Sequence, residues 1–140
     1  MVQEAYVSFE TAKLLKEKGF DEDINLWYDK NGDKFFKYHY EISRDWRVRQ
    51  NQQVYQCPTQ QMAMRWLREA HNLVICAEIA NENNKGNTDY SNPDRWSWFF
   101  DLTNEKGVVI EPESDYILNE FDSYEDAVEV AIQYCLTYLI

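Results

Sequence analysis

Side chains able to act as nucleophiles or bases are few in this chain of 140 residues. Its histidines are His39 and His71, and its cysteines are Cys57, Cys76 and Cys135. A catalytic thiol needs a base within reach, and the sequence offers one such arrangement, a cleft lined by His39, Cys57 and acidic residues. No spacing requires that arrangement, so a buried structural thiol is the simpler interpretation of Cys57. We assign no catalytic residue and keep a small enzyme with a Cys, His and carboxylate cleft as an alternative.

Patterns that hold metals, phosphates or cofactors are absent from the sequence. An odd number of cysteines without C-x-x-C spacing argues against a disulfide framework and against a structural zinc site. The segment 29–33 suits a hairpin turn better than a calcium loop, because Lys34 and Tyr40 stand where that loop needs a glycine and an acid. Neither a glycine-rich phosphate loop nor an H-E-x-x-H motif occurs. We therefore expect no metal site and no cofactor.

A basic and aromatic stretch between residues 34 and 50 is the clearest positive feature. Five basic residues stand there against two acidic ones. Aromatic and basic side chains together can stack on bases and contact phosphates, which leaves a single-strand nucleic-acid binder using residues 38–49 as a second alternative. The net charge of −11 opposes nucleic acid as a partner, so we favour core packing for the aromatics and pairing with acids for the arginines. The candidate binding residues of this stretch are Tyr38, Tyr40, Trp46, Arg47 and Arg49.

Acidic residues dominate the chain, with 25 Asp and Glu against 14 Lys and Arg. The last forty residues, 101–140, hold ten acids and a single basic residue, Lys106. A surface of this kind either serves ordinary solubility or docks on a basic protein partner. The second interpretation makes a non-enzymatic, acidic protein-interaction module the leading hypothesis.

Three segments have the periodicity of amphipathic helices, and each has a signal at its start. Ser8 is the expected N-cap of the first helix, which ends where Gly19 takes the left-handed conformation and Phe20 folds back on the helix. Thr59 and Ser123 are the expected N-caps of the second and third helices. The third helix is apolar over most of its circumference, which places it in the core or against a second subunit. A homodimer through this C-terminal helix is therefore a further expectation.

Alternation of apolar and polar residues predicts the strands. Asn31-Gly32 separates the first two and suits a two-residue type I′ turn. The resulting order, α-β-β-(β)-α-β-β-β-α, predicts one compact α+β domain over residues 1–140, with a mainly antiparallel sheet and about three helices packed on one face. The expected strands are 24–28, 34–40, a stretch within 46–55, 73–79, 95–102 and 108–110.

A long polar segment, 81–94, separates two of these strands. Loops of this length in compact domains are functional or mobile. Trp96 and Trp98 follow it directly and share one face of their strand. We therefore expect the recognition surface at this loop and these two tryptophans.

The three helical segments together resemble small uncharacterised proteins encoded by phages, prophages and other mobile elements of gut bacteria. The segments are 6–20, 58–72 and 123–132, which begin Tyr6-Val7-Ser8-Phe9, Pro58-Thr59-Gln60-Gln61 and Ser123-Tyr124-Glu125-Asp126 and cover about a third of the chain. The resemblance implies a phage-related origin and an accessory role inside a bacterial host cell. It implies no catalytic residue, no cofactor and no reaction.

Two further observations bear on location. No apolar run approaches the ~20 residues that span a bilayer. The residues after Met1 lack the basic and apolar stretches of a secretory signal. We expect a soluble cytoplasmic protein with a protein partner and no membrane, and we favour a protein over nucleic acid as the partner.

Overall fold

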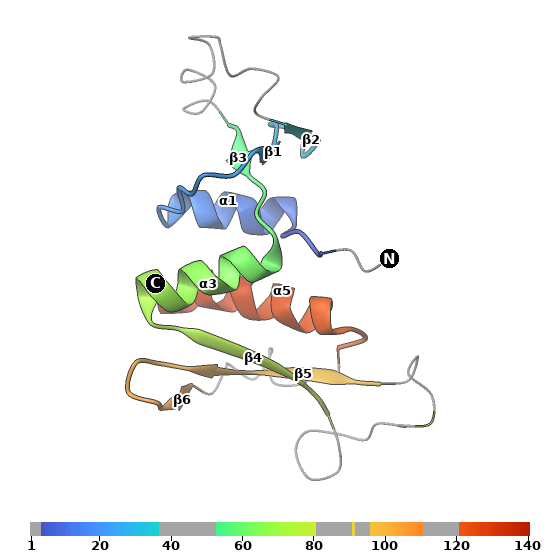
Figure 1. Ribbon diagram of the computed structural model, residues 1–140, viewed down its shortest axis with the longest axis vertical. Coiled ribbons are helices and arrows are strands. Elements are labelled where there is room, and N and C mark those ends of the chain that lie inside the picture. The colour runs from blue at the N-terminus through green and yellow to red at the C-terminus, as the bar shows by residue number, and fades with distance from the viewer. Residues whose placement is uncertain (1–3, 37–52, 81–90, 92–95, 111–120) are drawn as a thin grey trace. The chain divides into compact units, whose positions relative to one another are not determined.

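The computed structural model describes residues 4–36, 53–80, 91, 96–110 and 121–140 (Figure 1). The chain divides into two compact units, Met1–Ala63 and Met64–Ile140, here called unit 1 and unit 2. The α+β class and the predicted order of helices and strands are confirmed. The strands form two three-stranded sheets, β2-β1-β3 in unit 1 and β4-β5-β6 in unit 2, and not one sheet as the sequence suggested. A single domain over residues 1–140 stays a prediction.

The first helix, α1 (Phe9–Glu17), begins and ends as its sequence predicts. The hydroxyl of Ser8 accepts a hydrogen bond from the backbone N–H of Thr11 at 3.2 Å. At the other end Gly19 has a φ of 91°, which a side chain would strain. The Phe20 N–H donates to Leu15 O at 2.9 Å, and the Gly19 N–H donates to Lys16 O at 3.1 Å. These two hydrogen bonds form a Schellman motif. This motif turns the chain back and leaves Phe20 buried beside the helix end.

The hairpin of unit 1 joins β1 (Leu26–Tyr28) to β2 (Lys34–Phe36) in antiparallel register. The prediction of a two-residue type I′ turn at Asn31-Gly32 is wrong. The Gly32 N–H donates to Asp29 O at 3.1 Å, and Gly32, unlike Asn31, has a positive φ, of 84°. The loop therefore has three residues with a glycine in the left-handed position. The Asp29 carboxylate favours this form because it accepts hydrogen bonds from the Asn31 and Asp33 N–H groups at 2.8 and 3.0 Å.

The third strand of unit 1, β3 (Tyr55–Gln56), pairs antiparallel with the other side of β1. Aromatic rings connect this sheet to α1, because Phe9 contacts Tyr28 and Tyr55 at ring centroid distances of 5.5 and 5.6 Å. The buried Tyr28 hydroxyl donates to Val7 O at 2.6 Å, so its polar end is satisfied inside the core. These contacts hold α1 and β1–β3 together as the framework of unit 1.

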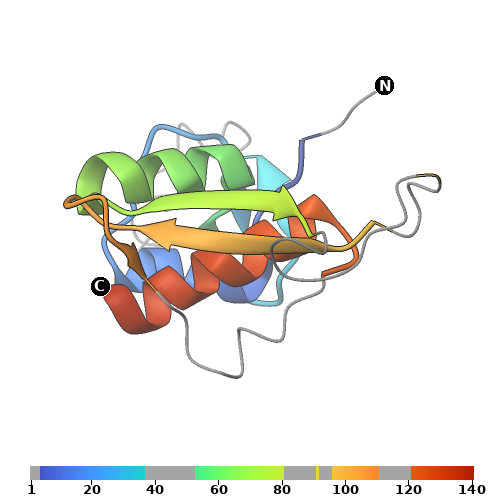
Figure 2. The same ribbon diagram turned by 90° about the horizontal axis from the view of Figure 1, so that it is seen from below.

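The sheet of unit 2 consists of β4 (Val74–Ile79), β5 (Trp98–Thr103) and β6 (Val109–Ile110), all antiparallel. Ile75 pairs with Leu102 and Ala77 with Phe100, so these four side chains share one face. The helices α3 (Gln60–His71, mostly in unit 2) and α5 (Tyr124–Tyr134) lie on one side of this sheet in both views (Figures 1 and 2). Helices on one face of an antiparallel sheet were expected, and unit 2 has this arrangement.

The helices α3 and α5 confirm the predicted capping residues. The Thr59 hydroxyl accepts from Met62 N–H at 3.2 Å at the start of α3, and the Ser123 hydroxyl accepts from Asp126 N–H at 3.0 Å at the start of α5. Asn72, with a φ of 56°, ends α3. Among the described residues, no helix has the length and apolarity needed to cross a membrane.

The C-terminal helix is mostly buried within the chain itself. α5 contacts β4 and β5 and continues into a five-residue π-helix, η3 (Cys135–Leu139). Its apolar residues from Ala127 to Leu136 are mainly buried, whereas Tyr138 is 54% exposed. This burial supports a core role for the helix, the first of the two roles that its composition allowed. The homodimer stays a prediction.

We predict that Gly19→Ala lowers the free energy of unfolding by about 1 kcal/mol. A methyl group at Gly19 would meet no atom within 4 Å, so the loss would come from the backbone conformation alone. Urea unfolding measures it, and Glu17→Ala at an exposed position of α1 is the control, with an expected change within about 0.5 kcal/mol. A loss at Gly19 no larger than that of the control would contradict the prediction.

Candidate functional site

Most of the candidate binding residues lie outside the described part of the chain. These are Tyr38, Tyr40, Trp46, Arg47, Arg49 and nearly all of loop 81–94. Trp96 and Trp98 are described, and both are half-buried. The Trp98 ring contacts Trp96 at 6.5 Å and meets Tyr124 edge-to-face at 5.7 Å between ring centroids. Trp98 thus packs against the start of α5, and its role in recognition stays a prediction.

The thiol and imidazole groups do not form a described catalytic arrangement. Cys57 is 1% exposed, and its Sγ lies 4.0 Å from Val7 O, as expected of a buried structural thiol. His39 lies outside the described residues. His71 ends α3, where a basic side chain suits the helix dipole, and its ring meets Trp66 at 4.7 Å. Within the described ranges, no three His, Cys, Asp or Glu side chains gather as a metal site would require.

The face of the β4-β5-β6 sheet opposite the helices is the first candidate surface, and Figure 2 looks onto it. Val74 pairs with Thr103, which pairs on its other side with Val109, so these residues form one row across the sheet. Val74 is 41% exposed and Val109 51% exposed. Val108, beside Val109, is exposed as well. We call the row formed by Val74, Thr103 and Val109 the valine row. Phe99, opposite Glu78, shares this face and is buried, so the exposed apolar area lies at the valine row.

Carboxylates accompany the valine row on the same face. Cys76 pairs with Asp101, and Glu78 follows Cys76 by two positions, so all three side chains point to this side. The Cys76 thiol donates to Glu78 Oε1 at 3.3 Å. Partial burial, the hydrogen bond to Glu78 and the negative charges of Glu78 and Asp101 raise the pKa of Cys76. The thiol of this face is therefore exposed but holds its proton.

The negative charge of the chain is divided unequally between the two units. Unit 1 has ten acidic and nine basic residues, whereas unit 2 has fifteen acidic and five basic residues. Unit 2 thus has a net charge of −10 against −1 for unit 1. The valine row belongs to the unit that supplies nearly all of the net charge.

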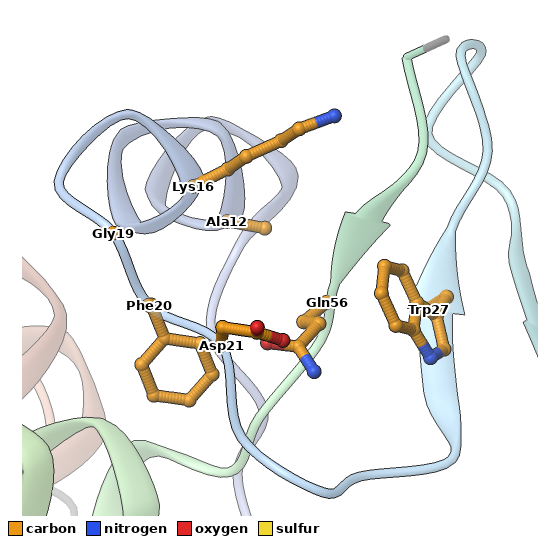
Figure 3. A pocket seen from close by; sticks show the side chains of 7 residues that line it. All are labelled: Ala12, Lys16, Gly19, Phe20, Asp21, Trp27 and Gln56. Atoms are coloured by element: carbon orange, nitrogen blue, oxygen red, sulfur yellow. The ribbon is translucent and has the colours of Figure 1, made fainter. Parts of the chain in front are cut away.

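The second candidate is a pocket of about 370 Å³ inside unit 1 (Figure 3). Its volume lies at the lower end of the range of ligand pockets, roughly 300–1,000 Å³. One wall comes from α1 and its C-terminal turn, and the other comes from β1 and β3. The lining residues are Ala12, Lys16, Gly19, Phe20, Asp21, Trp27 and Gln56.

Hydrogen bonds fix the walls of this pocket. The Glu22 N–H donates to Gln56 Oε1 at 3.1 Å, and Gln56 Nε2 donates back to Glu22 O, so the amide cannot rotate freely. Trp27 Nε1 donates to Ile24 O at 3.2 Å, and the indole is 6% exposed. Lys16 Nζ donates to Val54 O at 3.1 Å, and partial burial lowers the pKa of Lys16. The pocket is thus a preformed cavity with an aromatic wall.

Comparisons of the chain with protein-family models, with curated proteins and with solved structures found no match. The functional assignment therefore depends on the chain's own features. Sequence reasoning missed both the valine row and the pocket. The alternation of apolar and polar residues in segment 73–79 predicts that Val74 and Cys76 point away from the core. This was the one signal in the sequence for the valine row. The pocket joins residues from Ala12 to Gln56, and local pattern carries no signal for it.

We predict that Glu78→Gln speeds alkylation of Cys76 by iodoacetamide at pH 8 by about two- to fivefold. Removing the carboxylate lowers the pKa of the thiol, and the thiolate is the reactive form. Mass spectrometry of the intact chain follows the reaction. The buried Cys57 and Cys135 stay unmodified while the chain is folded, because burial raises the pKa of Cys135 to about 12 and both thiols are inaccessible.

Glu105→Gln is the matched control for Glu78→Gln. It removes one exposed acid from the turn between β5 and β6, outside the set of charges that act on Cys76. Equal rates for the two variants would show that Glu78 does not control the thiol.

Proposed function

We propose that the protein is a non-catalytic protein-interaction module that docks on a basic partner through the valine row of the β4-β5-β6 sheet. The observation that carries the proposal is the valine row, exposed on the unit with a net charge of −10. Exposed apolar side chains that stand together on a regular surface favour association. Carboxylates beside them favour a partner of opposite charge.

The two features of this face have different physical roles. The side chains of Val74 and Val109 can be buried by a partner, and burial of apolar area stabilises a complex by roughly 25 cal/mol per Å² before the costs of association are subtracted. Glu78 and Asp101 lie beside them on the same face. Their charges, with those of the whole unit, raise the rate of encounter with a basic surface and exclude acidic ones. Apolar contact thus supplies affinity, and charge supplies selection.

The phage-type accessory role belongs to the same proposal. Its support is the resemblance of segments 6–20, 58–72 and 123–132 to small proteins of phages and mobile elements. An accessory protein that acts by binding needs no reactive centre, and this agrees with the burial of Cys57. Under this proposal the partner is a basic protein of the bacterial host or of the phage, met in the cytoplasm.

We predict that the full chain, used as bait in a bacterial lysate, captures basic proteins at 0.1 M salt and loses most of them at 1 M salt. The Debye length falls from about 10 Å to about 3 Å between those conditions, which screens the charges of unit 2. The double variant Val74→Thr with Val109→Thr keeps the β-branched shape but removes the apolar row, and it should reduce capture about tenfold. Quantitative mass spectrometry measures both effects.

Met62→Gln is the control for that experiment, because Met62 is an exposed apolar residue of unit 1. It should capture the same proteins as the unchanged chain. A captured partner should also slow the alkylation of Cys76, which lies on the proposed docking face. Capture that is equal for the double variant, or a Cys76 rate that the bound partner does not alter, would refute docking at this face.

A further inference from the structure

The indole of Trp27 lines the pocket of unit 1. Trp27 Nε1 is occupied by Ile24 O at 3.2 Å, so the N–H of the ring is satisfied within the protein. The contribution of Trp27 to the lining is therefore its aromatic ring and not its N–H, and an aromatic ring attracts cations. The opposite part of the lining comes from Ala12 and Phe20, both buried.

The charged groups of the pocket are not equivalent. The Lys16 ammonium donates to Val54 O at 3.1 Å and lies 5.0 Å from the centroid of the Tyr55 ring. In Figure 3 its side chain extends from α1 with the amine pointing away from Asp21. By contrast, no side chain or backbone group within the described residues makes a hydrogen bond or an ion pair with the Asp21 carboxylate. The charge with which the pocket can attract a ligand is therefore the negative charge of Asp21.

The residues that follow Asp21 in the sequence are negatively charged as well. Glu22 and Asp23 follow Asp21 in the sequence and are exposed, so two further acidic residues adjoin the one that lines the pocket. Lys16 is the single basic residue of the lining. An anionic ligand would enter against these carboxylates, whereas a cation would meet Asp21 and the Trp27 ring together. The polar face of Gln56, held by Glu22, adds an amide that can accept or donate a further hydrogen bond.

We propose that this pocket binds an organic cation, a guanidinium or ammonium group on a short aliphatic stem. The cationic group pairs with the Asp21 carboxylate and lies against Trp27, and the stem packs on Ala12 and Phe20. A volume of about 370 Å³ suits a ligand of this size. Such a group occurs on free small amines and on arginine or lysine side chains of a protein. The pocket lies within unit 1, so this proposal is independent of the docking face of unit 2.

The test uses the full chain and calorimetric titration with four probes. Agmatine represents a free guanidinium compound, and the capped peptide acetyl-Gly-Arg-Gly-amide represents an arginine side chain. The same peptide with citrulline in place of arginine has nearly the same shape but no charge, and glutarate is the anionic probe. We expect agmatine or the arginine peptide to bind at least tenfold more tightly than citrulline peptide or glutarate. Agmatine alone would indicate a free amine as the ligand, and binding of the peptide would indicate a protein side chain; either result supports the proposal.

Variants of the lining then assign the binding to this pocket. Asp21→Asn should weaken binding of the cation about tenfold, because a charge-assisted hydrogen bond is lost. Lys16→Met should strengthen it about two- to fivefold, since the positive charge at the rim is removed. Asp33→Asn, which makes the same charge change in the exposed hairpin loop, should leave the affinity within about twofold of the unchanged chain.

An indole N–H signal in two-dimensional NMR gives a second readout, with Trp27→Phe identifying which of the five tryptophan signals belongs to the pocket. This signal should shift as the cation is added. Absence of cation binding, equal binding of the citrulline peptide, tighter binding after Asp21→Asn, or weaker binding after Lys16→Met would each overturn the proposal.

Discussion

The pairing of β4 with β5 determines which side chains of the unit 2 sheet are buried and which are exposed. In the observed register Ile75 lies opposite Leu102 and Val74 opposite Thr103. Because side chains alternate along a strand, a shift of one residue would turn the apolar set away from α5 and the polar set toward it. The burial of α5 and the exposure of the valine row are thus two results of the same pairing. The face that we propose for docking exists because the other face is committed to the core.

Unit 1 depends in the same way on the turn that ends α1. Gly19 allows the chain to reverse, and Phe20, Asp21 and Glu22 follow within a few residues. Glu22 then fixes the Gln56 amide through two hydrogen bonds between segments 34 residues apart in the sequence. The pocket is the space enclosed by this reversal and by Trp27 on β1. Its aromatic wall comes from β1, and the Asp21 carboxylate, which has no hydrogen-bond or ion-pair partner among the described residues, comes from the turn after α1.

Sequence reasoning worked where the determinants are local. The hydroxyls of Ser8, Thr59 and Ser123 cap helices as their positions predict, because each interaction joins residues three apart. Asn31-Gly32 was misinterpreted because the Asp29 carboxylate, two residues upstream, stabilises a longer loop in competition with the type I′ turn. The dipeptide Asn31-Gly32 favours a type I′ turn, but the side chain of Asp29 stabilises a different class of turn.

Long-range features were beyond the reach of pattern. Alternation predicts strands but not their partners, so two sheets were taken for one. The pocket requires α1, β1 and β3 to meet, and charge counts could not show that one unit carries a net of −10 until the boundary near Ala63 was known. The candidate residues of segments 38–49 and 81–94 were chosen by composition, and most lie outside the described residues. The two sheets and the pocket each depend on contacts between distant parts of the chain.

The protonated state of the Cys76 thiol has a consequence for the protein under oxidising conditions. Oxidants and disulfides react with the thiolate. The carboxylates beside Cys76 raise its pKa and so keep the thiolate fraction of Cys76 low. Cys57 and Cys135 are sheltered by burial. The three cysteine thiols are therefore slow to form sulfenic acid or to cross-link two copies of the chain, although one of them lies at the surface.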